Sequence, residues 1–162
     1  MAPQRIRFFL WLVGHDRIMK NSNRMRHNLT SDPSCKHCNV EETTLHLLWD
    51  CKTAKKIWQQ IVLNRDLNSF FTPPLWHWLS LNLNPPVNSN HKWSTTCTIT
   101  LWRIWRWRNI KCFENPSFEP WKPFEFIMTQ SNTITKAMKS SSKIDVLLKS
   151  EKLIRWMTPP DD

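Results

Sequence analysis

"CKHCNVEETTLHLLWDC", residues 35–51, is the stretch around which the fold of this chain must be organised. It places three cysteines and one histidine within seventeen residues, in the spacing Cys35-x2-Cys38-x7-His46-x4-Cys51. Such a set can hold a metal ion, carry out thiol redox chemistry, or lie by chance on an ordinary amphipathic helix. Each interpretation predicts a different role for these four side chains.

The spacing favours a metal site. Two cysteines separated by two residues bend the backbone so that both sulfurs face one ion, and a later histidine and cysteine complete a tetrahedron. Thiolates prefer zinc or iron–sulfur clusters to magnesium or calcium. Three thiolates and one imidazole form a closed structural zinc shell with no position left for water. We therefore predict one structural Zn²⁺ that is held by Cys35, Cys38, His46 and Cys51.

The other two interpretations explain less of the pattern. A redox site needs only Cys35 and Cys38, leaves His46 and Cys51 without a role, and has no strand–helix context here. Few large apolar side chains occur in residues 30–52, so apolar burial does not offset an ordering cost of about 1.5 kcal/mol per residue. A structural zinc ion contributes about 10–16 kcal/mol to the free energy of folding, which is sufficient to hold such a stretch in one conformation. His37 lies inside the cysteine pair, and we expect its side chain to point away from the ion.

Helical periodicity flanks the cysteine-rich stretch on both sides. After it, apolar side chains recur on one helical face at Ala54, Ile57, Trp58, Ile61 and Val62. Before it, a second stripe consists of Ile6, Phe9, Leu10 and Val13, and Met25 with Leu29 predicts a short helix after Ser22. The chain has one glycine and eleven prolines, so helices joined by proline- and asparagine-rich loops are favoured over a sheet. The predicted fold class is mainly α.

Clusters of proline divide the chain. We predict a small helical zinc-binding domain over residues 1–66, a proline- and asparagine-rich linker over 67–96, a Trp-rich helical segment over 97–155, and a disordered tail over 156–162. Within the linker, a short helix that packs back on a core is expected from Phe70, Leu75, Trp76, Trp78 and Leu79.

The charge favours a polyanionic partner. The chain carries 23 Lys and Arg against 13 Asp and Glu, a net charge of +10, and such an excess is typical of nucleic-acid binding. Residues 1–30 contain Asp16 as their single acid, and residues 92–111 contain none. The candidate nucleic-acid contacts are Arg5, Arg7, Arg17, Arg24, Arg26, Arg103, Arg106 and Arg108. The alternative is an ordinary solvated basic surface.

The segment "LWRIWRWRN", residues 101–109, interleaves arginine with tryptophan. Exposed indoles and guanidinium groups can bind single-stranded nucleic acid by base stacking and phosphate contacts. Alternatively, the helix is buried and its arginines stack on their own tryptophans. Three indoles within six residues favour burial, because a soluble protein rarely exposes so much apolar surface.

The longest apolar run, Phe8 to Val13, is far too short to cross a bilayer, so we expect no membrane association. We expect an intracellular protein, nuclear or cytoplasmic, whose cysteines are reduced or bound to metal. We expect no small-molecule substrate.

The segments "PQRIRFFLWLVGHDRIM" (residues 3–19) and "SCKHC…EETTLHLLWDC" (residues 34–51) together resemble the zinc-binding domain that follows the reverse transcriptase of plant non-LTR retrotransposons. The resemblance covers residues 3–62 and is carried by Pro3, Phe9, Trp11, Cys35, Cys38, Glu42, Thr43, His46, Cys51, Ile57 and Trp58. "LWRIWRWRNIKCF" (residues 101–113) and "IRWMTPPDD" (residues 154–162) are similar to the linker and lead-in to a ribonuclease H domain that is itself absent from the sequence.

The resemblance implies a structural zinc module that derives from a reverse transcriptase and assists weak, sequence-tolerant binding of RNA or single-stranded DNA. We expect no catalytic residue, because a closed zinc shell activates no water and the thirteen acids are scattered along the chain. Two alternatives remain. The chain is a protein-interaction module whose zinc loop and tryptophans form the partner surface, or it is a non-functional remnant of a decayed retroelement.

Overall fold

The computed structural model describes residues 3–62, 67–84 and 91–150, and the side chains of 3–62, 69–84 and 92–140. The helices are α1 (Gln4–Gly14), α2 (Asn21–Arg26), η1 (His46–Asp50), α3 (Lys52–Ile61), α4 (Leu67–Phe70), α5 (Leu75–Leu83), α6 (His91–Asn109), η2 (Ile110–Glu114) and α7 (Pro123–Ser150). Two of them, η1 and η2, are single π-helical turns. The described residues contain no strand beyond one isolated bridge, so the mainly α prediction is confirmed.

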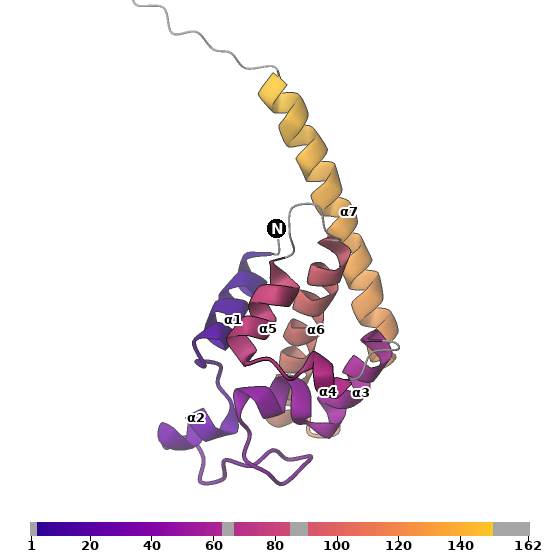
Figure 1. Cartoon of the computed structure of the whole chain (residues 1–162). Coiled ribbons are helices and arrows are strands. Elements are labelled where there is room, and N and C mark those ends of the chain that lie inside the picture. The colour runs from indigo at the N-terminus through magenta and orange to yellow at the C-terminus, as the bar shows by residue number, and fades with distance from the viewer. Residues whose placement is uncertain (1–2, 63–66, 85–90, 151–162) are drawn as a thin grey trace, which may run out of the picture.

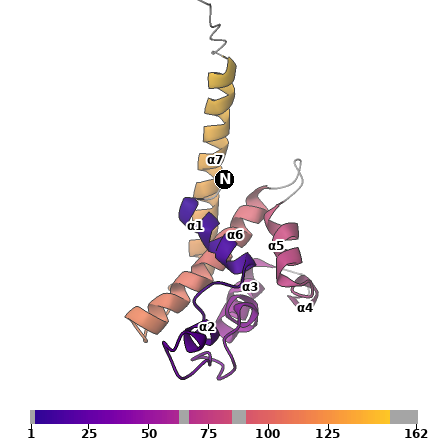
Figure 2. The same cartoon turned by 90° about the vertical axis from the view of Figure 1, so that its left-hand side faces the viewer.

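Helix α6 lies at the centre of the arrangement and contacts α1, α5, α7 and η1. Helices α1 and α5 lie together beside α6, while α2 and the cysteine-rich loop form the opposite end of the body from the far end of α7 (Figure 1). In the view turned by 90°, α1 crosses in front of α6 on the outside of the molecule (Figure 2). The cysteine-rich stretch is therefore attached to one end of a helical body.

The two apolar stripes predicted beside the cysteine-rich stretch are both buried. In α1 these are Ile6, Phe9 and Val13, and in α3 they are Ala54, Ile57 and Trp58. The Phe9 ring packs on α6, with its centroid 5.3 Å from that of Trp102 and 6.1 Å from that of Trp105. The predicted short helix forms as α2, but Met25 and Leu29 are exposed, and α2 buries Asn21 and Ser22 instead.

Aromatic rings from three helices meet in the core. The Trp78 ring of α5 lies 5.2 Å from Trp49 of η1 and 5.7 Å from Trp58 of α3, and Phe70 and Phe71 pack around all three indoles. The indole nitrogen of Trp58 donates to the Leu48 carbonyl at 2.9 Å. The short helix expected within residues 67–96 thus forms as α5 and packs against the cysteine-rich region. Separate folding of the zinc and Trp-rich parts stays a prediction, and the predicted tail, 156–162, lies outside the described residues.

Helix α6 agrees with the buried interpretation of the Trp-rich segment. Its Leu101 and Ile104 are buried, while the three indoles of residues 101–109 (Trp102, Trp105 and Trp107) are half-buried against the same core. The Arg108 guanidinium lies 5.7 Å from the centre of the Trp105 ring, as expected for an arginine that stacks on its own helix.

Helix α7 packs on α6 through its first half and then extends beyond the body (Figure 1). Ile127 and Ser131 are buried at the contact, and Arg103 of α6 donates its Nε to the Gln130 side chain at 2.6 Å. None of the helices in the described part of the chain is both long enough and apolar enough to cross a membrane.

Candidate metal centre

Four side chains from the cysteine-rich stretch converge. The ligand atoms of Cys35, Cys38, His46 and Cys51 all lie within 4.8 Å of one another. The Cys51 sulfur lies 3.8 Å from the sulfur of Cys35 and 3.8 Å from that of Cys38. A tetrahedral zinc ion with Zn–S bonds of about 2.3 Å separates two sulfurs by about 3.8 Å. The cluster therefore has the dimensions of a tetrahedral zinc site.

The first two cysteines are presented by a tight loop. The Cys35 amide donates to the Val40 carbonyl at 2.8 Å, and the Asn39 amide donates to the Cys35 carbonyl at 2.9 Å. Asn39 has a φ of 54°, in the left-handed region that asparagine tolerates better than most residues. An antiparallel bridge between Ser34 and Glu41 closes the base of the loop. These backbone bonds turn the chain so that both sulfurs face the same point.

The histidine and the third cysteine are placed by η1. The Cys51 amide donates to the His46 carbonyl at 2.7 Å, five residues back, which is the bond that makes this turn π-helical. The Thr43 hydroxyl accepts a hydrogen bond from the His46 amide at 3.0 Å and so caps the start of the turn. Periodicity in the sequence predicted α3 but did not predict the π-helical turn that precedes it.

Burial at the site leaves one polar atom without a partner. Cys35, His46 and Cys51 are buried, and Nε2 of His46 makes no hydrogen bond within the described part of the chain. Buried polar atoms are nearly always paired, so an unpaired imidazole nitrogen beside three sulfurs is what a metal ligand requires. The donor set, the size of the cluster and the unpaired nitrogen all fit zinc.

The thiols influence one another strongly. A hydrogen bond with Cys51 is the main cause that lowers the pKa of Cys35 to about 4, and the same contact together with burial raises the pKa of Cys51. The Lys52 amide points at the Cys38 sulfur from 3.5 Å, where it stabilises negative charge. The lowered pKa of Cys35 and the hydrogen bond to Cys38 both favour the thiolate ligands that zinc takes.

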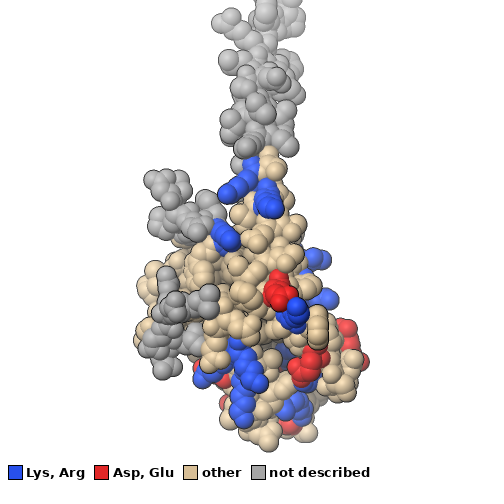
Figure 3. Space-filling view, turned by 90° about the vertical axis from the view of Figure 1, so that its right-hand side faces the viewer, with Lys and Arg blue, Asp and Glu red and all other residues tan. Residues whose placement is uncertain are grey.

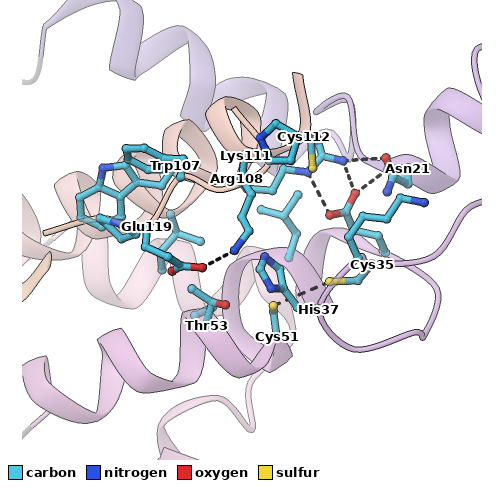
Figure 4. Close-up of a pocket in the computed structure, with 18 of the residues that line it drawn as sticks. Asn21, Cys35, His37, Cys51, Thr53, Trp107, Arg108, Lys111, Cys112 and Glu119 are labelled. Carbon is cyan, nitrogen blue, oxygen red and sulfur yellow. Dashed lines mark hydrogen bonds and ion pairs between the residues drawn. The ribbon is translucent and has the colours of Figure 1, made fainter. Parts of the chain in front are cut away.

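A cavity of about 520 Å³ lies beside the cluster, between it, the end of α6 and residues 116–120 (Figure 4). His37 lines this cavity and is not part of the four-residue cluster. Cys112 lines it as well, and burial raises the pKa of its thiol. Lys111 and Glu119, which both line the cavity, form an ion pair with each other. The cavity is thus formed jointly by the metal region and the segment that follows α6.

An ion pair that the sequence did not reveal connects the metal region to α6. The Glu42 and Arg108 side chains are only 3% and 9% exposed. Arg108 donates its Nε to one carboxylate oxygen at 3.0 Å and pairs with the other oxygen through a terminal nitrogen. The Asn21 amide at the start of α2 donates to the same carboxylate at 2.7 Å. We call these three residues the Glu42 latch, because they join α2, the metal loop and α6.

The arginines predicted to contact nucleic acid fall into two groups. Exposed members are Arg5, Arg7, Arg17, Arg26 and Arg106. Arg24 and Arg103 are half-buried and donate to the side chains of Asn21 and Gln130, while Arg108, whose side chain is buried, pairs with Glu42. On the face that carries α7 and α3, basic side chains are scattered among acidic ones and form no single patch (Figure 3). Three of the eight predicted arginines are therefore engaged with side chains of the protein itself.

Comparison with known proteins agrees with the geometry. Residues 1–58 match the protein family described as zinc-binding in reverse transcriptase. A "putative ribonuclease H protein" of Arabidopsis thaliana is 29% identical over 167 residues, which cover 98% of this chain and 26% of that protein. The chain thus spans about a quarter of the length of that relative. No solved structure matches. The predicted resemblance to a reverse-transcriptase zinc-binding domain is confirmed, and the cluster is compatible with one zinc ion.

Proposed function

We propose that this chain, whose first 58 residues match the zinc-binding family of reverse transcriptases, is a structural zinc module that assists binding of RNA or single-stranded DNA. The buried cluster of three thiols and one imidazole carries the proposal. Cys35, Cys38, His46 and Cys51 would hold the ion, which would cross-link the loop to η1 and supply no open coordination position. The role of the metal is to fix the shape of the loop.

Attraction for nucleic acid has to come from arginine and lysine. Three thiolates around one divalent ion leave a net charge of −1 at the cluster, so the cluster itself does not attract phosphate. The arginines that would contact phosphate are the exposed ones, which are Arg5, Arg7, Arg17, Arg26 and Arg106. Asp16, the one acid near α1, has its carboxylate engaged by Lys20 at 2.7 Å and by the Thr44 hydroxyl. Burial by itself would raise the pKa of Asp16, but the hydrogen bonds from Lys20 and Thr44 outweigh burial, and the pKa is lowered.

We also propose that the chain performs no catalysis of its own and acts inside the cell, in the nucleus or cytoplasm. A shell filled by four protein ligands activates no water. "Ribonuclease H" in the name of the relative describes that protein, of which this chain spans about a quarter.

Titration of labelled RNA and single-stranded DNA at several salt concentrations tests the proposal. If about five phosphates are contacted, log K should fall with log salt at a slope of about −3.5. Arg7→Glu with Arg106→Glu should weaken binding and flatten the slope. Lys55→Glu with Lys56→Glu on the exposed side of α3 is the charge-matched control and should retain the wild-type slope. Absence of binding at about 50 mM salt would contradict the proposal and favour the interaction-module or remnant alternatives.

A further inference from the structure

Helix α1 carries a second row of rings on the side opposite to its buried stripe. Phe8 and Trp11 are 58% and 47% exposed, and His15, which follows the helix, is exposed as well. Their spacing of three and four residues places all three on one helical face, as Ile6, Phe9 and Val13 occupy the other. Because the buried stripe packs on α6 through Phe9, the opposite face of α1 is turned away from α6, and α1 itself lies outside α6 (Figure 2). We call Phe8, Trp11 and His15 the outer row.

The rings of the outer row lie against one another. Phe8 and Trp11 are stacked, with centroids 6.0 Å apart and planes inclined by 15°. Trp11 and His15 are 4.4 Å apart at 33°. The Nδ1 of His15 donates to the Trp11 carbonyl at 2.8 Å, which fixes the imidazole over the helix end. The row is therefore ordered by its own contacts, so little side-chain entropy is lost when a further ring stacks on the surface that remains exposed.

Arginines surround the outer row. Arg5 and Arg7 are exposed on α1, which carries no acidic residue, and Arg17 is exposed just beyond its end. A further arginine, Arg103 of α6, lies close to Arg106 and to Arg5 of α1. Burial is the main cause that lowers the pKa of Arg103, and repulsion from these two neighbouring guanidinium groups adds to it. Arginines thus flank the aromatic row along the chain, and the exposed carboxylate of Asp16, next to His15, is paired with Lys20.

We propose that the outer row is a stacking platform for unpaired bases of RNA or single-stranded DNA, with Arg5, Arg7 and Arg17 contacting the backbone phosphates. A polyanion that also presents flat apolar faces is the ligand that complements both the rings and the arginines. Bases in a duplex already stack on their neighbours and are not free to stack on protein. The inference rests on the proposed function and deepens it, because it assigns the site and requires single strands.

Binding of single-stranded RNA and of a duplex to Phe8→Ala/Trp11→Ala is the direct test. Single-strand affinity should fall by about fivefold to a hundredfold, with an unchanged salt slope because no charge is lost, while duplex binding stays the same. Trp121→Ala is the matched control, because Trp121 is 84% exposed and lies outside the outer row. It should bind like the wild type. Thermal unfolding of each variant verifies that the fold is retained.

A second variant separates stacking from apolar burial. Phe8→Leu/Trp11→Leu keeps apolar side chains on α1 but removes the aromatic faces, and it should lose single-strand affinity as the alanine variant does. Wild-type affinity in either variant, with salt-dependent binding retained, would overturn the platform and leave the proposed function resting on arginines alone. If the wild type binds no nucleic acid at low salt, the platform and the proposed function both fail.

Discussion

Cys51 contributes to the structure through both its side chain and its backbone. Its sulfur is the one that lies 3.8 Å from each of the other two, and its backbone is the N-cap of α3. It therefore couples the cluster to the helix that buries Trp58. His37 is only two residues from Cys35 along the chain, yet it faces the neighbouring cavity. A residue close in sequence to the cysteine pair, such as His37, is therefore not a ligand unless its side chain also reaches the cluster, as that of Cys51 does.

Cys51→Ser should abolish stoichiometric zinc binding and loosen residues 30–60, because a hydroxyl is a poor substitute for a thiolate in a site of this kind. His37→Ala should retain one zinc per chain. Elemental analysis of the purified variants measures both outcomes, and hydrogen exchange reports the loosening. Full zinc content in Cys51→Ser would refute the ligand assignment.

At the scale of elements, the Glu42 latch determines how α6 sits on the metal region. Arg108 reaches from the last turn of α6 to a carboxylate that also receives the first amide of α2. Breaking a buried ion pair by removing one partner leaves a buried charge without compensation, which commonly costs 3–5 kcal/mol. The Glu42 carboxylate therefore contacts all three elements, and Arg108 adds a direct hydrogen bond to the Asn21 side chain at 2.8 Å.

Arg108→Met should lower the free energy of unfolding by about 3–5 kcal/mol. Arg106→Met, two residues earlier and exposed, is the matched control and should change it by less than about 0.5 kcal/mol. Adding Glu42→Gln to Arg108→Met should cost less than the sum of the single effects, since neither charge is then left alone. Additive losses in denaturant titrations would show that the two side chains do not interact.

At the scale of the whole molecule, one hydrophobic cluster runs from Ile6 of α1 to Ile127 of α7 and includes Trp49, Trp58 and Trp78. Trp49 of η1, Trp58 of α3 and Trp78 of α5 belong to this one cluster, so the metal region and the rest of the core share the same buried indoles. Loss of order around the metal should therefore reach the rest of the core.

Removal of zinc by a chelator should lower the midpoint of a single thermal transition by more than about 20 °C, because the metal contributes as much free energy as a whole domain commonly has. Calorimetry with and without chelator measures this, and readdition of zinc should restore the midpoint. A separate transition that is indifferent to the chelator would instead indicate two independently folding parts.

The features that were predictable from the sequence are the local ones. The spacing of Cys35, Cys38, His46 and Cys51 predicted the cluster, because a cysteine pair and a helical turn impose their geometry over a few residues. The buried stripes of α1 and α3 followed from periodicity for the same reason. The contact of Glu42 with Arg108 spans 66 residues, and no short-range pattern encodes it. Periodicity also identified only the inner face of α1, and it gave no role to the rings of Phe8, Trp11 and His15 on the opposite face.

The Glu42 latch also constrains how this sequence can change over generations. Replacement of either charged residue alone leaves the other charge buried without a partner and so destabilises the fold. A sequence under selection for stability therefore tolerates few single substitutions at these two positions. Positions 42 and 108 should therefore change together or remain as they are, although 66 residues separate them. A copy that no longer needs to fold would be released from that restriction, and the pair would then drift independently. The joint fate of these two positions among related copies would thus separate sequences still selected to fold from decayed ones.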